Sequence, residues 1–166
     1  MSGYPHTLTT ELKNCSNMEA LAFFYQHSMD MIEWFKQNKS KIESSNPDLD
    51  KWTALEIISH ILYWDHLFME HRFLPTANGE RKLITLDDPR TNIKSITIAA
   101  KGFSYLIQDL QRSRKQMTNI FGELEDSQWE NYSFHPEWKR VDLFRLIEEL
   151  IKHDCQHGKV IEKMIS

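Results

Sequence analysis

Glycine, proline and cysteine are scarce in this chain of 166 residues, and each scarcity excludes a class of structure. Five glycines and five prolines favour long helices over many short strands joined by tight turns. Two cysteines, Cys15 and Cys155, are too few for a disulfide framework and indicate a reducing compartment. We therefore expect a cytoplasmic protein built mainly from helices.

Long apolar runs and a large excess of one charge are also missing. No stretch approaches the roughly 18 unbroken apolar residues of a membrane span, and the N-terminal residues lack the apolar core of a signal peptide. The net charge is −4 with both signs mixed, so neither a membrane nor nucleic acid is an expected partner. The basic run Arg112, Arg114 and Lys115 is interpreted as the solvated side of a helix. The length predicts a single domain over residues 1–166, in which residues 1–15 form a polar N-terminal arm.

Apolar residues that recur every three or four positions predict four long helices. Two of them begin at capping boxes, Ser16 with Glu19 and Thr53 with Glu56. No segment has the pattern of a strand, so we expect an all-α four-helix bundle with a long crossover loop between its second and third helices. The predicted helices cover residues 16 to about 41, 53 to about 73, about 93 to 122 and 143 to 164, with connections at 75–92 and 125–140.

The last predicted helix carries two histidines, His153 and His157, on its apolar seam. Residues four apart on a helix stand one above the other, with Cβ atoms about 5–6 Å apart, so both imidazoles can reach one metal ion. His60 occupies a seam position of the second helix. If these two helices pack side by side, the three imidazoles converge in the core. Three protein ligands leave a coordination position open, which is typical of a catalytic metal site.

Other interpretations of these residues stay open. A seam histidine is more often a core residue bonded to a carbonyl or a carboxylate. The segment from His153 to His157 is similar to a zincin helix, but Asp154 stands in place of the expected glutamate and few residues follow for a third ligand. The Glu-x-x-His motif of di-iron bundles does not occur. Cys155 adjoins both histidines in sequence, but neighbours on a helix point about 100° apart, so we expect a small core residue there.

Two stretches of the chain resemble the DinB-like (YfiT-like) superfamily of metal-associated proteins. Residues 52–65 are similar to its pattern of a tryptophan, a capped helix and a histidine. Residues 142–161 are similar to its C-terminal pattern, with a glycine directly after the second histidine. The segment before the last helix departs from the usual small or hydroxyl cap, and we expect Asp142 to serve there. The resemblance implies a four-helix bundle, frequently dimeric, and a divalent metal, most often nickel or zinc, held by His60, His153 and His157.

Members of this superfamily with known activities include bacillithiol S-transferases and a mycothiol-dependent maleylpyruvate isomerase. The resemblance therefore implies a metal-dependent thiol transferase or hydrolase that acts on a small-molecule substrate, with a low-molecular-weight thiol as cosubstrate. Asp154 is a candidate general base, or an acceptor for an imidazole N–H, and Tyr63 is a second catalytic candidate. Tyr63, Trp64 and Tyr25 are expected to line the cavity or to be core residues. The alternative function is a non-catalytic binding or interaction module that the metal stabilises.

Overall fold

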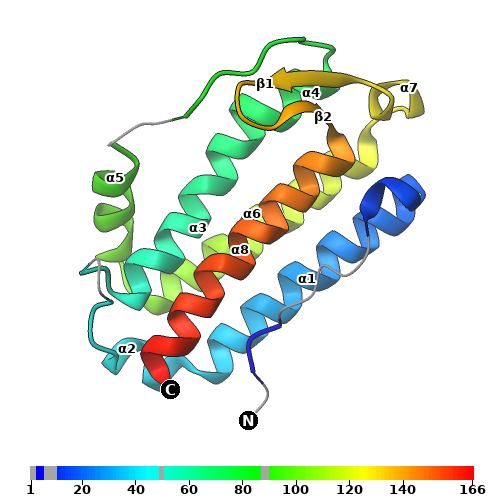
Figure 1. Cartoon of the computed structure of the whole chain (residues 1–166). Coiled ribbons are helices and arrows are strands. Elements are labelled where there is room, and N and C mark those ends of the chain that lie inside the picture. Colours follow the sequence, from blue (N-terminus) through cyan, green and yellow to red (C-terminus); the bar gives the residue numbers. More distant parts are fainter. Residues whose placement is uncertain (1–2, 6–10, 49–50, 87–89) are drawn as a thin grey trace.

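The protein is mostly helical, as the sequence predicted, with a small antiparallel sheet at one end (Figure 1). A computed structural model describes residues 3–5, 11–48, 51–86 and 90–166. Four long helices lie side by side, and α1 and α3 each pack against both α6 and α8. They are α1 (Asn17–Gln37), α3 (Ala54–Phe68), α6 (Phe103–Glu123) and α8 (Leu143–Ile165). The shorter elements are η1 (Leu12–Asn14), α2 (Lys39–Ser44), η2 (Met69–Phe73), α4 (Leu74–Ala77), α5 (Arg90–Ala99), α7 (Asp126–Trp129), β1 (Tyr132–His135) and β2 (Lys139–Asp142).

Within the described residues, no helix has both the length and the apolar character needed to cross a bilayer.

Side-chain caps set the starts of three long helices. The Ser16 hydroxyl accepts a hydrogen bond from the N–H of Glu19, and the Glu19 carboxylate accepts one from the N–H of Ser16. Thr53 and Glu56 form the same reciprocal pair at the start of α3, so both predicted capping boxes are confirmed. Asp142 caps α8 by accepting a bond of 2.8 Å from a first-turn N–H, as expected. These side chains satisfy amides that have no partner within the helix.

Three of the predicted helices differ from the prediction: two are broken and one is longer. The first breaks at Asn38 and continues as α2. The second does not end ahead of Pro75: the π-helical η2 and then α4 extend it to Ala77, because proline is tolerated in the first turn of a helix. The third is two helices, since Gly102 has a left-handed backbone with φ of +88° between α5 and α6. The connection between α4 and α5 is therefore shorter than the predicted 75–92, and its residues 87–89 lie outside the described ones.

A β-hairpin precedes α8, and the expectation of a chain without strands was wrong here. β1 and β2 pair antiparallel, with His135 opposite Lys139 at the turn. Lys139 has a left-handed φ of 62°, the backbone that short hairpin loops need at one position. The segment after α4 adds to the hairpin, because the N–H of Leu83 donates to the carbonyl of Phe134 at 3.0 Å. Strands of four residues are too short for their alternating pattern to stand out in a sequence.

Apolar side chains fill the space between the long helices, but the predicted inner face of α1 needs correction. The spacing of three and four residues from residue 18 to residue 35 predicts Met18 and Tyr25 on that face, but they are 75% and 42% exposed. Phe24 and Met31 are buried instead. The other positions of the predicted seam, from Leu21 to Phe35, are buried, so the core face of α1 is broader than that seam on the side of Phe24 and Met31.

A buried ion-pair network joins all four long helices, and its centre is Arg114 of α6. The guanidinium lies 2.8 Å from Asp65 of α3 and 2.7 Å from Asp154 of α8, and Asp154 also lies 3.2 Å from the Nε2 of His27 on α1. The interpretation of residues 112–115 as a solvated helix face was wrong at Arg114, which is fully buried. Buried charges are costly unless they are paired, so this network favours one arrangement of the four helices.

Candidate metal centre

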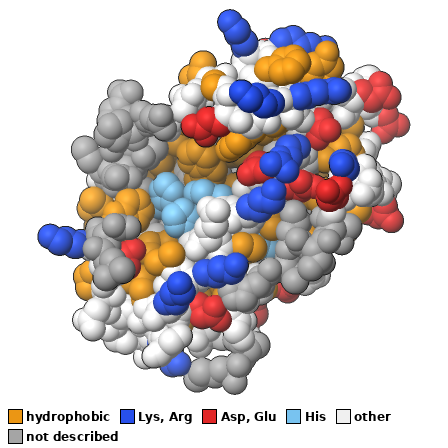
Figure 2. All heavy atoms as spheres, viewed as in Figure 1, with side chains coloured by type: hydrophobic (Ala, Val, Ile, Leu, Met, Phe, Trp, Pro, Cys, Tyr) orange, Lys and Arg blue, Asp and Glu red, His pale blue; other side chains and the backbone are white. Residues whose placement is uncertain are grey.

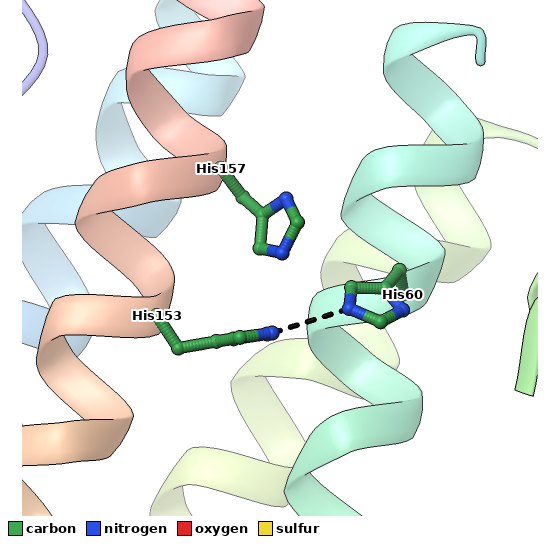
Figure 3. A group of neighbouring side chains, drawn as sticks. All are labelled: His60, His153 and His157. Carbon is green, nitrogen blue, oxygen red and sulfur yellow. Dashed lines mark hydrogen bonds between the residues drawn. The ribbon is translucent and has the colours of Figure 1, made fainter. Parts of the chain in front are cut away.

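Three histidines from two neighbouring helices point into the same space (Figure 3). His60 lies on α3, and His153 and His157 lie on consecutive turns of α8. The Nε2 atoms of His60 and His153 are 3.1 Å apart. One ring nitrogen from each histidine lies within 4.8 Å of the other two. The structure therefore brings together the three side chains that the helical spacing singled out.

The cluster lies at the edge of the core, whereas the helical spacing predicted that the imidazoles converge within the core. Asp154 and Gly158, which directly follow the two histidines of α8, are the buried positions, and all three imidazoles are partly exposed. Figure 2 shows histidine side chains at the surface of this face, beside hydrophobic ones. The reason is geometric: the apolar stripe of a helix with 3.6 residues per turn drifts away from a strict seven-residue repeat.

Two tryptophans pack around the imidazole rings. Trp64, one turn after His60, stacks on His153 with ring centroids 5.2 Å apart, and its centroid lies 6.4 Å from that of His60. Trp52, just before the cap of α3, meets His60 edge-on at 5.4 Å. Large aromatic contacts of this kind restrict ring orientation without using the ring nitrogens. Trp64 therefore lines the cluster, as expected.

Burial favours the neutral form of the three imidazoles. It lowers the pKa of His60 to about 4, and the neighbouring His157 adds to the shift. Burial, and then His157, also lower the pKa of His153 well below the ordinary value. Burial lowers the pKa of His157 as well, and the charge of Asp154 opposes that shift. Neutral imidazoles have the free lone pair that a metal ligand needs.

The donor set fits a divalent transition metal. Imidazole nitrogens bind zinc at about 2.0–2.1 Å, so two ligands of one ion stand about 3 Å apart. The Nε2 atoms of His60 and His153 have this separation, 3.1 Å. The Nδ1 atoms of both rings are buried and have no hydrogen-bond partner among the described residues. The alternative was that these histidines are core residues bonded to a carbonyl or a carboxylate. Neither Nδ1 atom makes such a bond to a described residue.

Asp154 and Tyr63, the expected catalytic candidates, have other contacts. Asp154 is fully buried and its oxygens bond to Arg114 and His27, so it is not a solvent-facing charge. Although burial alone would raise it, Arg114 and His27 hold the pKa of the Asp154 carboxyl below its usual range. A carboxylate held in this way is a poor general base. Tyr63 is partly exposed, and its ring centroid lies 5.3 Å from the Nζ of Lys94 on α5.

Cys155 and Tyr25 also have their contacts outside the cluster. Cys155 packs against the apolar core, as expected, and burial, followed by the charge of Asp154, raises the pKa of its thiol to about 11. Tyr25 lies in a shallow groove between α1 and α6, so the expectation that it lines the cavity or the core was wrong.

The buried charges beside the cluster were missed in the sequence, although they leave a signal there. Arg114 stands between Leu110 and Met117 at steps of four and three residues, which is a position on the apolar seam. Asp65 stands likewise between Ile61 and Phe68 on α3. Burial raises the pKa of Asp65 to about 6, against the lowering effect of Arg114. Opposite charges on two predicted seams are a pattern that indicates a buried ion pair.

The fold and the site define a mostly helical protein with a candidate three-histidine metal centre. The family model of the DinB superfamily matches residues 33–161, a span that includes all three histidines. The chain therefore belongs to the DinB superfamily, whose members are in general metal-binding, and the resemblance seen in the sequence is confirmed. No curated protein matches the chain.

Proposed function

We propose that the protein binds one divalent metal ion, nickel or zinc, through His60, His153 and His157. The observation that carries this proposal is the 3.1 Å approach of the Nε2 atoms of His60 and His153. The third imidazole lies within reach of the same point, and membership of a metal-binding superfamily supports the assignment. In this proposal the four long helices form a four-helix bundle of the DinB type, with the connection after α4 as its crossover.

Around this ion we infer a metal-dependent enzyme of the thiol S-transferase or hydrolase type. Three protein ligands leave a coordination position for a substrate, and the partial exposure of the imidazoles gives a small molecule access to it. A bound ion supplies a Lewis acid that favours the deprotonated form of a water or a thiol. The chain itself contributes the neutral imidazoles and the packing of Trp52 and Trp64, which holds the rings in place. Asp154 is a positioning residue in this scheme, because its ion pairs anchor α8 beside His153.

A non-catalytic module is the second candidate, and the placement of the ligands favours it in one respect. His60 lies 93 residues before His153, so a metal here would cross-link α3 and α8. In that case the metal contributes folding free energy rather than chemistry. The fourth coordination position separates the two candidates: a protein ligand there supports the module, and an exchangeable water or thiol supports the enzyme.

Metal content tests the site. Untagged wild-type protein, incubated with nickel or zinc and then desalted, should hold about one equivalent by mass spectrometry, and His60→Ala should hold little. His66→Ala is the matched control, because His66 is an exposed histidine of the same helix, and it should keep the metal. Negligible metal in both wild type and His60→Ala would overturn the proposal.

Turnover tests the reaction class. Metal-loaded wild type should act either on a thiol paired with an electrophile or on an activated ester or amide, and His153→Ala should not. A metal-loaded protein that is inert across a broad panel of both kinds, with its fourth position closed, leaves the module as the function. We also propose a homodimer, which sedimentation of the wild type measures.

A further inference from the structure

A second group of buried polar side chains lies at the hairpin end of the molecule, and its first member is Arg72. This residue of η2 is only 2% exposed. One of its terminal nitrogens donates to the carbonyl of His71 at 3.1 Å, while its Nε–H has no partner among the described residues. No described carboxylate lies within ion-pair distance of it. A buried guanidinium is costly unless an anion pairs with it.

His135 of β1 is the second member, and it is 4% exposed. Its Nδ1 accepts hydrogen bonds from the backbone N–H groups of Glu137 and Trp138, both at 3.2 Å. Burial, followed by the charge of Arg72, lowers the pKa of His135, so the ring is neutral at pH 7. With Nδ1 as the acceptor, the single ring proton lies on Nε2. This Nε2–H is buried and has no partner among the described residues.

Both side chains contact the ring of Trp138. Its ring stacks on His135 with centroids 4.1 Å apart, and the guanidinium carbon of Arg72 lies 5.8 Å from its centroid. The charge of Glu137 acts to raise the pKa of Arg72, but the Glu137 side chain is exposed. Burial lowers the pKa of Arg72 to about 10, which leaves it charged at neutral pH. Near the hairpin there are therefore two buried donors and a positive charge for which the described residues offer no acceptor.

The backbone at Arg72 is itself unusual. Met69–Phe73 is π-helical, a rare form that occurs mostly as single turns within α-helices and frequently at functional sites. The wider turn changes the direction of the side chains that follow α3, and Arg72 falls within it.

We propose that Arg72 and His135 form an oxyanion-binding site that takes a carboxylate or a phosphate group. An oxyanion accepts hydrogen bonds from both the Nε–H of Arg72 and the Nε2–H of His135 and neutralises the guanidinium. Water would accept the two protons but leave the charge unpaired. Arg72 follows His60 by 12 residues, about 18 Å along a helix, so this site is separate from the candidate metal centre.

Thermal unfolding in the presence of anions tests the site. Wild-type protein, stripped of metal, is titrated with phosphate and with succinate, and chloride at equal ionic strength is the reference. A ligand that binds the folded state raises the Tm with its concentration. We expect at least one of the two oxyanions to raise the Tm more than chloride does, and the one that acts more strongly identifies the preferred group.

Two variants and a matched control test whether Arg72 binds the oxyanion. Arg72→Met keeps the length and apolar stem of the side chain, and it should need at least tenfold more oxyanion for the same shift. Arg72→Lys keeps the charge without the Nε–H, and its Tm response should fall between those of the wild type and Arg72→Met. Arg112→Met removes an arginine whose side chain is 65% exposed and should respond as wild type does.

The proposal fails if neither oxyanion stabilises the wild type beyond chloride. It also fails if Arg72→Met responds to the oxyanion as the wild type does. If Arg72→Met does not fold, a wild-type response of Arg72→Lys overturns the proposal in the same way. The use of metal-free protein keeps this result independent of the three-histidine centre.

Discussion

Single buried charges do much to specify the interior of this protein. Arg114, Asp65 and Asp154 are each fully buried and lie on three different long helices. Their mutual contacts of 2.7–2.8 Å satisfy charges that would otherwise oppose folding. The same rule singles out Arg72, because it is buried and no carboxylate of the described residues pairs with it.

Replacing Arg114 by alanine should destabilise the protein strongly, by about 3–5 kcal/mol, because two carboxylates are left buried without their counter-ion. Urea unfolding of metal-free protein measures the loss. Arg112→Ala, two residues away on the exposed face, should change stability by no more than about 0.5 kcal/mol. A triple variant, Arg114→Met with Asp65→Asn and Asp154→Asn, should recover part of the loss. A cost below about 1 kcal/mol for Arg114→Ala would contradict the network.

Cys155 should be a slow nucleophile despite its place between two histidines in sequence. Its pKa of about 11, against an ordinary 9.0, leaves roughly a hundredfold less thiolate at pH 8. Alkylation by iodoacetamide, followed by mass spectrometry of peptides, should be correspondingly slower in folded than in urea-unfolded protein. The rate should rise as the pH approaches 11. Equal rates in the two states would show that this thiol is accessible and ordinary.

At the scale of elements, α8 is the helix on which the candidate site depends. Asp142 sets its start, and its two histidines face α3. On its other side α8 meets Tyr4 of the N-terminal arm, whose hydroxyl donates to the carbonyl of Asp154 at 3.2 Å. The ring of Tyr4 is 2% exposed and lies directly on Gly158. The glycine after the second histidine therefore makes room for an aromatic ring from the arm.

Gly158→Ala should destabilise the protein, although alanine favours a helix over glycine by about 1 kcal/mol. A Cβ at this position would lie 2.0 Å from the Cζ of Tyr4, so the arm or the helix must move, at a typical cost of about 1–3 kcal/mol. In a Tyr4→Ala background the clash is gone, and the same substitution should be neutral or stabilising. Thermal unfolding of the four proteins measures this coupling. Additive effects would mean that Tyr4 does not occupy this place.

At the scale of the whole molecule, the candidate centre links segments that are far apart in the chain. One ligand comes from α3 and two from α8, with the buried network beside them. A metal that binds only the folded state therefore acts on the global stability of the protein.

Nickel or zinc should raise the free energy of unfolding of the wild type by about 2.7 kcal/mol at a concentration one hundred times the Kd. His60→Ala and His153→Ala should each lose most of this effect, since each removes a ligand from one side of the link. His66→Ala should retain it. Denaturant unfolding with and without a chelator is the measurement. An equal metal effect in all four proteins would place the binding elsewhere.

Much of the fold could be predicted because it depends on local chemistry. The caps at Ser16, Thr53 and Asp142 act within four residues, so the starts of three helices could be predicted from short patterns. The hairpin and the break at Gly102 escaped prediction, because short strands and a single glycine leave weak signals. His153 and His157 share a face of α8 by their spacing alone. His60 joins them only because α3 packs against α8.

The sequence by itself determined that the chain is mostly helical, where three of the long helices begin and which three imidazoles could meet, since periodicity and capping are properties of neighbouring residues. Only the tertiary structure decided where the cluster lies, which charges are buried and which donors lack a partner. Arg112 and Arg114 belong to one basic run, yet one is exposed and the other is fully buried between two carboxylates. The difference arises because burial depends on what packs against a helix face, and that is set by residues far away in the chain.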